Sequence, residues 1–268
     1  PNQFAMEEPY IDYNINFTQK AYGLDKIERQ SYSAETNLTQ AIMNQNNDTV
    51  KSIRLWDWSP LQQTYAQLQE MRTYYSFKDV DIDRYMINGE YRQVMLGVLE
   101  LVQTKLPAQA QNWVNQKLKY THGYGVAMSP VNEVTGEGLP TFLIKNIPPE
   151  SLTDSLAITR PEIYYGEETN DYVIVNTKYP EFDYPMGDAN VESMYQGKSG
   201  VTVHSAFRRL MYSMAFGDYK LLLSKDLTND SQILYNRNIH ERVRKAAPFL
   251  HYDYDPYPVV SDGKIYWI

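Results

Sequence analysis

The sequence predicts an α+β fold, in which helices pack on a mixed or antiparallel sheet and the N-terminal portion is helical. Helical patterns dominate residues 1–78, and strands and helices then alternate irregularly. Asn-Gly and Asp-Gly pairs between extended runs mark two hairpins. Because the chain shows no repeat, low-complexity tract or flexible linker, we expect a single α+β domain over residues 1–268, with a possible helical subregion over 1–78.

The helical N-terminal portion begins with residues 7–22, EEPYIDYNINFTQKAY, and Gly23 ends this helix. Residues 38–47 predict a second short helix. The stretch SPLQQTYAQLQEM predicts a third, with Ser59 as N-cap and Pro60 as the first helical residue. The apolar residues of the third helix share one face and are Leu61, Tyr65, Leu68 and Met71.

Extended runs follow from residue 79. Asn88-Gly89 lies between DIDRYMI and EYRQVML, and Asp262-Gly263 separates PVVS from KIYWI. Both pairs predict hairpins, because a tight two-residue turn requires positive φ. FLIKNI predicts a strand over 142–147, and ITRPEIYYGEETNDYVIVNTKYPEFDYP predicts two strands around an acidic connection.

Three further helices are predicted between and after these strands. LPAQAQNWVNQKLKY gives a helix over 107–119, and SQILYNRNIHERVRKAAPFL gives one over 231–250. HSAFRRLMYSMAFGDYKLLLS is helical from residue 204, and its residues that face one way are Phe207, Leu210, Met211 and Met214. Cations of the last helix either contact anionic headgroups or a partner, or simply favour the helix dipole near its C-terminus; they are Arg237, Arg242, Arg244 and Lys245.

Composition excludes several classes of function. The net charge is −8 and the pI is near 5.1, which argues against nucleic-acid binding because phosphate contacts need a clustered positive surface. The chain has no cysteine, so thiol catalysis, disulfides and cysteine-zinc sites are excluded. The longest apolar run, VMLGVLELV, is far shorter than the roughly 20 residues of a membrane span. Since the chain starts at Pro1 without Met and ends within an extended run, we expect a fragment of a longer protein.

His122 in YTHGYG is the first candidate for catalysis, because an imidazole oriented by a carboxylate or carbonyl can act as a general base. Glu133 and Ser129 could supply a carboxylate and a nucleophile, but no G-x-S-x-G motif is present. The structural interpretation is that Gly123 and Gly125 allow a bend, where His122 hydrogen-bonds the backbone. A single histidine without a fixed partner favours the structural interpretation.

A calcium-loop template matches residues 79–90 at its acidic positions, which are Asp79, Asp81, Asp83 and Glu90. The glycine that the sharp turn of such a loop requires is replaced by Arg84, so a hairpin fits this stretch better. The four histidines also fall in no metal-binding pair. We therefore predict no metal and no cofactor.

Glutamate, aspartate and tyrosine are concentrated in RPEIYYGEE and KYPEFDYP. Paired carboxylates beside aromatic rings are typical of glycosidases and of sugar-binding surfaces. These stretches make Glu162 a candidate catalytic carboxylate, and the candidate ligand-binding residues are Tyr164, Tyr165, Glu167 and Asp183. The alternative, which we favour from sequence, is cross-strand tyrosine packing with charged strand edges.

Several long stretches together resemble one protein family: SIRLWDWSPLQQTYAQLQEMRTYYSFKDVDIDRY, INGEYRQVML, YTHGYGVAMSPVNEVTGEGLPTFLIKNIPP, ITRPEIYYGE, YVIVNTKYPEFDYP and NIHERVRKAAPFLHYDYDPYPVV. The chain is identified by them as a member of Uncharacterised Protein Family 0182, found in actinobacteria, cyanobacteria and other bacteria. The resemblance implies a large integral membrane protein with several N-terminal transmembrane helices, of which this chain is the following extracytoplasmic, water-soluble region. It implies no catalytic residues.

We therefore expect a non-catalytic, extracytoplasmic region at the cell membrane that binds an envelope ligand or a membrane-protein partner, or assembles with itself. The alternative is a hydrolase of envelope material with His122, Glu133 and Glu162 near a cleft. A hydrolase requires His122 in a concave pocket, whereas a binding module requires exposed tyrosine-rich segments and a buried, hydrogen-bonded His122. A third possibility is that residues 59–268 only scaffold the membrane part of the protein, and this requires neither feature.

Overall fold

The computed structural model describes residues 2–31, 37–69, 72–187 and 189–268. Two compact units divide the chain, Pro1–Asn47 and Asp48–Ile268. The second unit contains every strand of the described chain, together with helices, so the predicted α+β class is confirmed. The expectation of one domain over residues 1–268 stays a prediction.

The first unit is helical, as predicted. Helix α1 (Gln3–Ala21) is followed by Gly23 at φ 67°, a left-handed conformation that ends helices. Helix α2 (Gln40–Gln45) has Thr39 as N-cap, whose side chain accepts a hydrogen bond from the Ile42 backbone N–H at 3.3 Å. No residue of α1 is buried.

Helix α4 (Trp58–Gln69), which follows the short α3 (Asn47–Lys51), covers one face of the main sheet. Leu61 and Tyr65 are fully buried there, whereas Leu68 is 46% exposed. Met71 lies outside the described residues. The helix begins at Trp58, so Ser59 lies within the first turn and not at the predicted N-cap.

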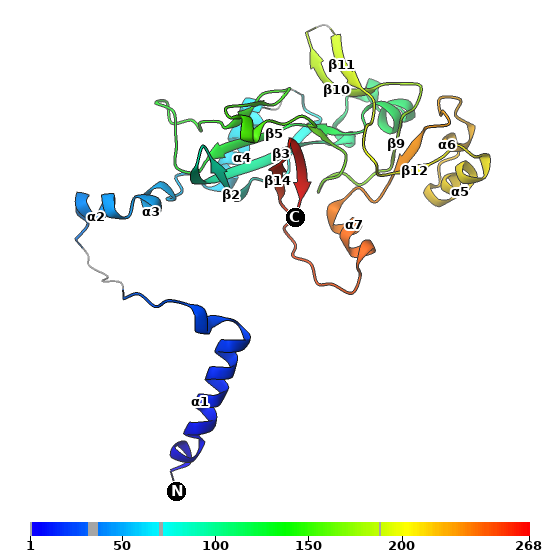
Figure 1. Cartoon of the computed structure of the whole chain (residues 1–268). Coiled ribbons are helices and arrows are strands. Elements are labelled where there is room, and N and C mark those ends of the chain that lie inside the picture. Colours follow the sequence, from blue (N-terminus) through cyan, green and yellow to red (C-terminus); the bar gives the residue numbers. More distant parts are fainter. Residues whose placement is uncertain (1, 32–36, 70–71, 188) are drawn as a thin grey trace. The chain divides into compact units, whose positions relative to one another are not determined.

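The main sheet is antiparallel throughout, in the order β1-β3-β5-β6-β7, with β2 also paired to β3. Figure 1 shows its strands β2, β3 and β5. Its strands are β1 (Tyr75–Phe77), β2 (Asp81–Ile87), β3 (Glu90–Leu101), β5 (Val126–Pro130), β6 (Ile144–Lys145) and β7 (Glu150–Ser151). The hairpin predicted at Asn88-Gly89 joins β2 to β3, with φ of 52° and 81° at these residues. The strand predicted over 142–147 is the short β6.

Strand β3 is buried on both faces, because each face meets a different core. Met95 and Leu99 point into the core under α4, and Leu96 and Val98 point into a second core. The second core is closed by the hairpin of β14 (Pro258–Ser261) and β15 (Lys264–Trp267). This hairpin turns at Asp262-Gly263, as predicted, with φ of 49° and 72°.

A smaller antiparallel sheet has the order β12-β13-β9 and is composed of β9 (Val173–Val175), β12 (Val201–Thr202) and β13 (Gln232–Leu234). Two more strand pairs are β4 (Gly123–Tyr124) with β8 (Glu162–Ile163), and β10 (Glu181–Met186) with β11 (Ala189–Ser193). Figure 1 shows the β10–β11 hairpin projecting from the body of its unit. Ile174 packs on one face of β9, and Val173 and Val175 pack on the other.

The remaining predicted helices are partly confirmed. Residues 206–216 form α5 and residues 220–223 form α6, and the apolar face of α5 is exposed; it consists of Phe207, Leu210, Met211 and Met214. The prediction over 231–250 was wrong in its first half, where β13 forms, and α7 covers only Ile239–Ala246. The helix predicted over 107–119 is broken into short turns, including a π-helical turn at Asn115–Lys119. Across the described part of the chain, no helix combines the length and apolarity of a membrane span.

Candidate functional site

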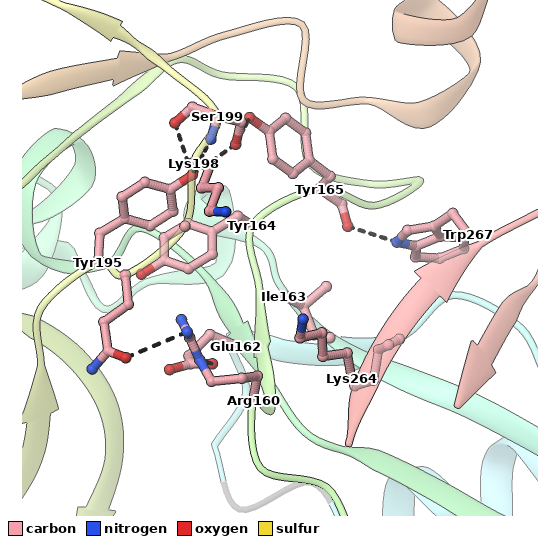
Figure 2. A pocket seen from close by; sticks show the side chains of 13 residues that line it. Arg160, Glu162, Ile163, Tyr164, Tyr165, Tyr195, Lys198, Ser199, Lys264 and Trp267 are labelled. Atoms are coloured by element: carbon pink, nitrogen blue, oxygen red, sulfur yellow. Dashed lines mark hydrogen bonds and ion pairs between the residues drawn. The ribbon is translucent and has the colours of Figure 1, made fainter. Parts of the chain in front are cut away.

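One pocket brings together three segments that are distant in the sequence: the β8 segment, the connection from β11 to β12, and strand β15 (Figure 2). Its volume is about 420 Å³, within the range of roughly 300–1,000 Å³ that small-molecule sites occupy. We call it the Tyr–Trp pocket. The lining residues used below are Arg160, Glu162, Tyr164, Tyr165, Tyr195, Lys198, Ser199, Lys264 and Trp267.

The aromatic walls of the Tyr–Trp pocket are held in place by their own polar atoms. The Tyr165 hydroxyl donates to Ser199 Oγ at 2.9 Å, and the Tyr195 hydroxyl donates to the Ser199 carbonyl at 2.8 Å. The Trp267 indole N–H donates to the Tyr165 carbonyl at 2.9 Å. A Cβ at Gly197 would lie 2.3 Å from the Tyr195 hydroxyl, so only glycine fits there. The rings are thus fixed before any ligand arrives.

The charges of the Tyr–Trp pocket are mostly positive. Arg160 Nε pairs with Glu162 Oε2 at 3.2 Å. The ammonium groups of Lys198 and Lys264 have no ion pair among the described residues, and Figure 2 shows both directed into the pocket. Two cations are therefore available to an anionic ligand.

His122 packs against Tyr164 of this pocket, with ring centroids 4.7 Å apart, and is fully buried. Its Nδ1 lies 2.9 Å from Thr121 Oγ1, and its Nε2 lies 3.1 Å from Asp183 Oδ1. The single Thr121 hydroxyl proton goes to Glu181 Oε2 at 2.5 Å, so Thr121 accepts the hydrogen bond from Nδ1. The Asp183 carboxylate accepts a second hydrogen bond, from Nε2. With both ring nitrogens facing acceptors, this is the arrangement that favours an imidazolium ion between two buried carboxylates.

The electrostatics of His122 follow from this arrangement. Burial alone disfavours the charged ring and lowers its pKa, but the hydrogen bond to Asp183 and the negative charges of Glu181 and Asp183 outweigh burial. The net effect raises the pKa of His122 above its ordinary value. The Tyr164 hydroxyl also donates to Glu181 Oε2, at 2.8 Å, so the same network supports one wall of the Tyr–Trp pocket.

Local backbone features explain how the network forms. The register of β10 and β11 shifts between Phe182 and Tyr184, and this bulge leaves Glu181, Phe182 and Asp183 all buried. Gly123 has no room for a Cβ, which would lie 2.2 Å from the Leu99 carbonyl of β3. Gly125 has φ 97°, as a bend requires. Gly123 therefore lets the backbone after His122 approach β3 of the main sheet closely, and Gly125 allows the bend that follows.

The predicted catalytic residues are not joined by any hydrogen bond or ion pair within the described residues. Glu162 lines the Tyr–Trp pocket, but Glu133 lies at a different cavity and pairs with Arg92. Ser129 is fully buried in β5. The catalytic roles of His122, Glu133 and Glu162 stay predictions.

The predicted ligand-binding residues divide into two groups. Tyr164 and Tyr165 line the Tyr–Trp pocket, whereas Asp183 is buried against His122. Glu167 lies elsewhere, and its backbone N–H donates to the buried carboxylate of Glu100 at 2.7 Å. Burial, followed by the charges of neighbouring carboxylates, raises the pKa of Glu167 to about 8.

Three carboxylates lie close enough together to hold a cation, those of Asp79, Asp81 and Asp255, whose oxygens are within 4.8 Å of one another. The hairpin prediction is confirmed at this point: Asp83 and Glu90 belong to the β2–β3 ladder. Burial, followed by repulsion from Asp79 and Asp255, raises the pKa of Asp81 to about 7. A cluster of carboxylate oxygens suits hard cations, which prefer oxygen ligands.

Sequence reasoning missed several residues of the site. Tyr195, Lys198, Lys264 and Trp267 reach the pocket from distant segments, and no local pattern signals them. Arg237 was placed near a helix C-terminus, which is wrong, because it precedes α7 and is buried. Its guanidinium donates to three backbone carbonyls, those of Thr121, Tyr164 and Asp171. Burial lowers the pKa of Arg237 to about 10.

The fold and the site thus define an α+β protein with an aromatic, cationic pocket that shares Tyr164 with a buried histidine network. The chain belongs to the Uncharacterised protein family (UPF0182), whose model matches residues 1–268. The resemblance predicted from sequence is confirmed over the whole chain.

Bacterial relatives carry the same family description. A UPF0182 protein of Pelotomaculum thermopropionicum is 61% identical over 268 residues, which are 100% of this chain and 29% of the relative. A UPF0182 protein of Desulforamulus reducens is 59% identical, over 100% of this chain and 29% of the relative. One of Moorella thermoacetica is 54% identical, over 100% and 30%. The chain thus spans about three tenths of the length of these relatives, and no solved structure matches it.

Proposed function

We propose that this chain is an extracytoplasmic region of an integral membrane protein and that it binds a cell-envelope ligand in the Tyr–Trp pocket. In the full-length protein, transmembrane helices of the same chain would be its partners. The observation that carries the proposal is the contrast between two sites. Tyr164 and Tyr165 line an open cavity, while His122 is fully buried with both ring nitrogens hydrogen-bonded.

This contrast favours binding over hydrolysis. A general base has to reach its substrate within hydrogen-bond distance, and His122 has no accessible surface. Glu133 and Glu162 line separate cavities, so they do not face each other across one substrate. A rigid aromatic wall with a few polar groups is instead the usual form of a ligand site.

The binding proposal is tested by titrating the 268-residue chain with solubilised peptidoglycan fragments and with purified envelope polysaccharide, using isothermal titration calorimetry. We expect at least one of them to bind, and Trp267→Phe to weaken that binding several-fold. Trp58→Phe is the matched control, because Trp58 is 51% exposed and lies outside the pocket. Absence of binding to both materials, or equal loss in both variants, would contradict the proposal.

The location is tested separately in cells. Reporter fusions to the full-length protein, placed within this region, should be active only when the reporter folds outside the cytoplasm. A reporter that is active in the cytoplasm would refute the extracytoplasmic assignment.

A further inference from the structure

We propose that the Tyr–Trp pocket selects an acidic saccharide, in which a sugar ring packs on the aromatic wall and a carboxylate or phosphate pairs with Lys198 and Lys264. This inference rests on the proposed binding function and names the chemical class of its ligand.

The charge of the pocket carries the first step. Three cations and one anion line it, and the anion, Glu162, is already paired with Arg160 at 3.2 Å. Lys198 and Lys264 are exposed and unpaired among the described residues, although the chain as a whole has a net charge of −8. A cationic concavity on an acidic protein attracts anions and repels cationic ligands.

The aromatic residues carry the second step. The polar atoms of Tyr165 and Trp267 are hydrogen-bonded within the protein, so these partly exposed residues offer a ligand mainly ring surface. Arg242 lies 4.4 Å from the Tyr165 ring centre and so occupies part of that ring's surroundings. Apolar ring surface beside free ammonium groups fits a molecule with an apolar face and an acidic group.

The geometry of the rings favours a sugar over a nucleotide base. Tyr164 and Tyr195 meet edge to face, with centroids 4.8 Å apart and an interplanar angle of 78°. Both rings are nearly buried, 8% and 7% exposed, so they form the inner wall of the pocket and leave no parallel slot for a flat base. The ring surface that a ligand can reach belongs mainly to Tyr165 and Trp267, and a puckered ring with C–H groups suits it. Figure 2 shows the corner formed by Tyr164, Tyr165 and Tyr195 on one side of the pocket.

Lys198 is also well placed to select an anionic ligand, because the residues on either side of it, Tyr195 and Ser199, are held by hydrogen bonds. Tyr195 and Ser199 are joined by a hydrogen bond across the turn that contains Lys198, and the Ser199 backbone N–H donates back to the Tyr195 hydroxyl at 3.1 Å. Holding this turn in advance lowers the entropy that binding would otherwise lose.

The test compares four probes on the full 268-residue chain by calorimetry: an oligoglucuronate, a neutral oligoglucose of the same length, glucose 6-phosphate and adenosine monophosphate. We expect one or both acidic saccharides to bind more tightly than the neutral one, and added salt to weaken that binding. In the Lys198→Ala/Lys264→Ala double variant, the affinity for the acidic saccharide should fall about tenfold, since each exposed pair contributes modestly. Lys145→Ala, at an exposed lysine outside the pocket, should leave it unchanged.

The outcomes separate the parts of the proposal. Preference for glucuronate or for glucose 6-phosphate identifies the carboxylate or the phosphate as the anion, and both support the inference. Equal binding of the neutral sugar, or tighter binding of the nucleotide, overturns it while leaving the proposed binding function intact. Failure of all four probes also overturns it, and the envelope-material titration then decides the proposed function independently.

Discussion

Replacing the buried His122 with glutamine should destabilise the protein strongly. The imidazolium donates two hydrogen bonds, to Thr121 at 2.9 Å and to Asp183 at 3.1 Å, and lies 3.6 Å from Glu181. Hydrogen bonds that involve a charged group contribute about 1.5–3 kcal/mol each. Removing one partner of a buried ion pair costs about 3–5 kcal/mol, because the other charge stays buried. We therefore expect His122→Gln to lower the free energy of unfolding by about 3–5 kcal/mol.

The pH dependence gives the sharper part of this prediction. The folded-state pKa of His122 is raised above the value of 6.5 for a free histidine. The stabilisation it provides is therefore complete below pH 6.5 and is lost as the pH rises through the folded-state pKa. The difference between the original protein and His122→Gln should shrink over the same interval.

Urea denaturation, followed by tryptophan fluorescence, measures both effects when it is run below and well above pH 6.5. His251→Gln is the control, because His251 is exposed and should change stability little at any pH. A His122→Gln protein that is as stable as the original below pH 6.5, or a difference that grows at high pH, would refute the buried imidazolium.

Three further substitutions probe other parts of the structure by the same denaturation assay. Asp81→Asn should stabilise the protein by about 1–2 kcal/mol above pH 7 and by nothing below pH 3.8. The reason is that the folded-state pKa of Asp81 is raised to about 7, so its ionisation makes folding less favourable, and solvent screening reduces this effect. A loss of stability at high pH would contradict this. Gly166→Ala should cost more than about 2 kcal/mol, since its Cβ would lie 2.2 Å from the buried Glu100 carboxylate, and an unchanged stability would mean that this contact is absent. Leu61→Ala should cost about 2–5 kcal/mol and the half-exposed Leu68→Ala under about 1 kcal/mol; similar losses would count against the packing of α4.

Local signals in the sequence predicted the parts of the fold that depend on local geometry. The turns at Asn88-Gly89 and Asp262-Gly263 require positive φ, and these residue pairs adopt it readily. The register of the adjoining strands follows from such turns. The start of α4 was predicted to within two residues, at Pro60 where the helix begins at Trp58, because its apolar spacing is regular.

Elements that depend on distant partners were not predictable in this way. Residues 232–234 belong to a strand only because β9 and β12 pair with them on both sides. In isolation, the same residues continue the apolar pattern of the helix that follows them. Tertiary pairing thus overrode the local preference.

The candidate site shows the same division. Tyr164 and Tyr165 could be proposed from their own segment, because tyrosines cluster there beside acidic residues. The two lysines and Trp267 come from separate segments that only the folded chain brings together. The role of His122 depends on a bulge in β10 that leaves Asp183 buried, and no pattern in KYPEFDYP predicts that bulge.

Chemical-shift mapping of the isotope-labelled chain during titration with the oligoglucuronate examines ligand site and histidine network together. We predict that the Trp267 indole and Gly197 backbone signals shift with saturation, while both ring nitrogens of His122 stay protonated and unmoved. Shifts centred on the His122 ring, or on the Arg92–Glu133 cavity with the Trp267 signals unchanged, would contradict the assignment of the Tyr–Trp pocket as the binding site.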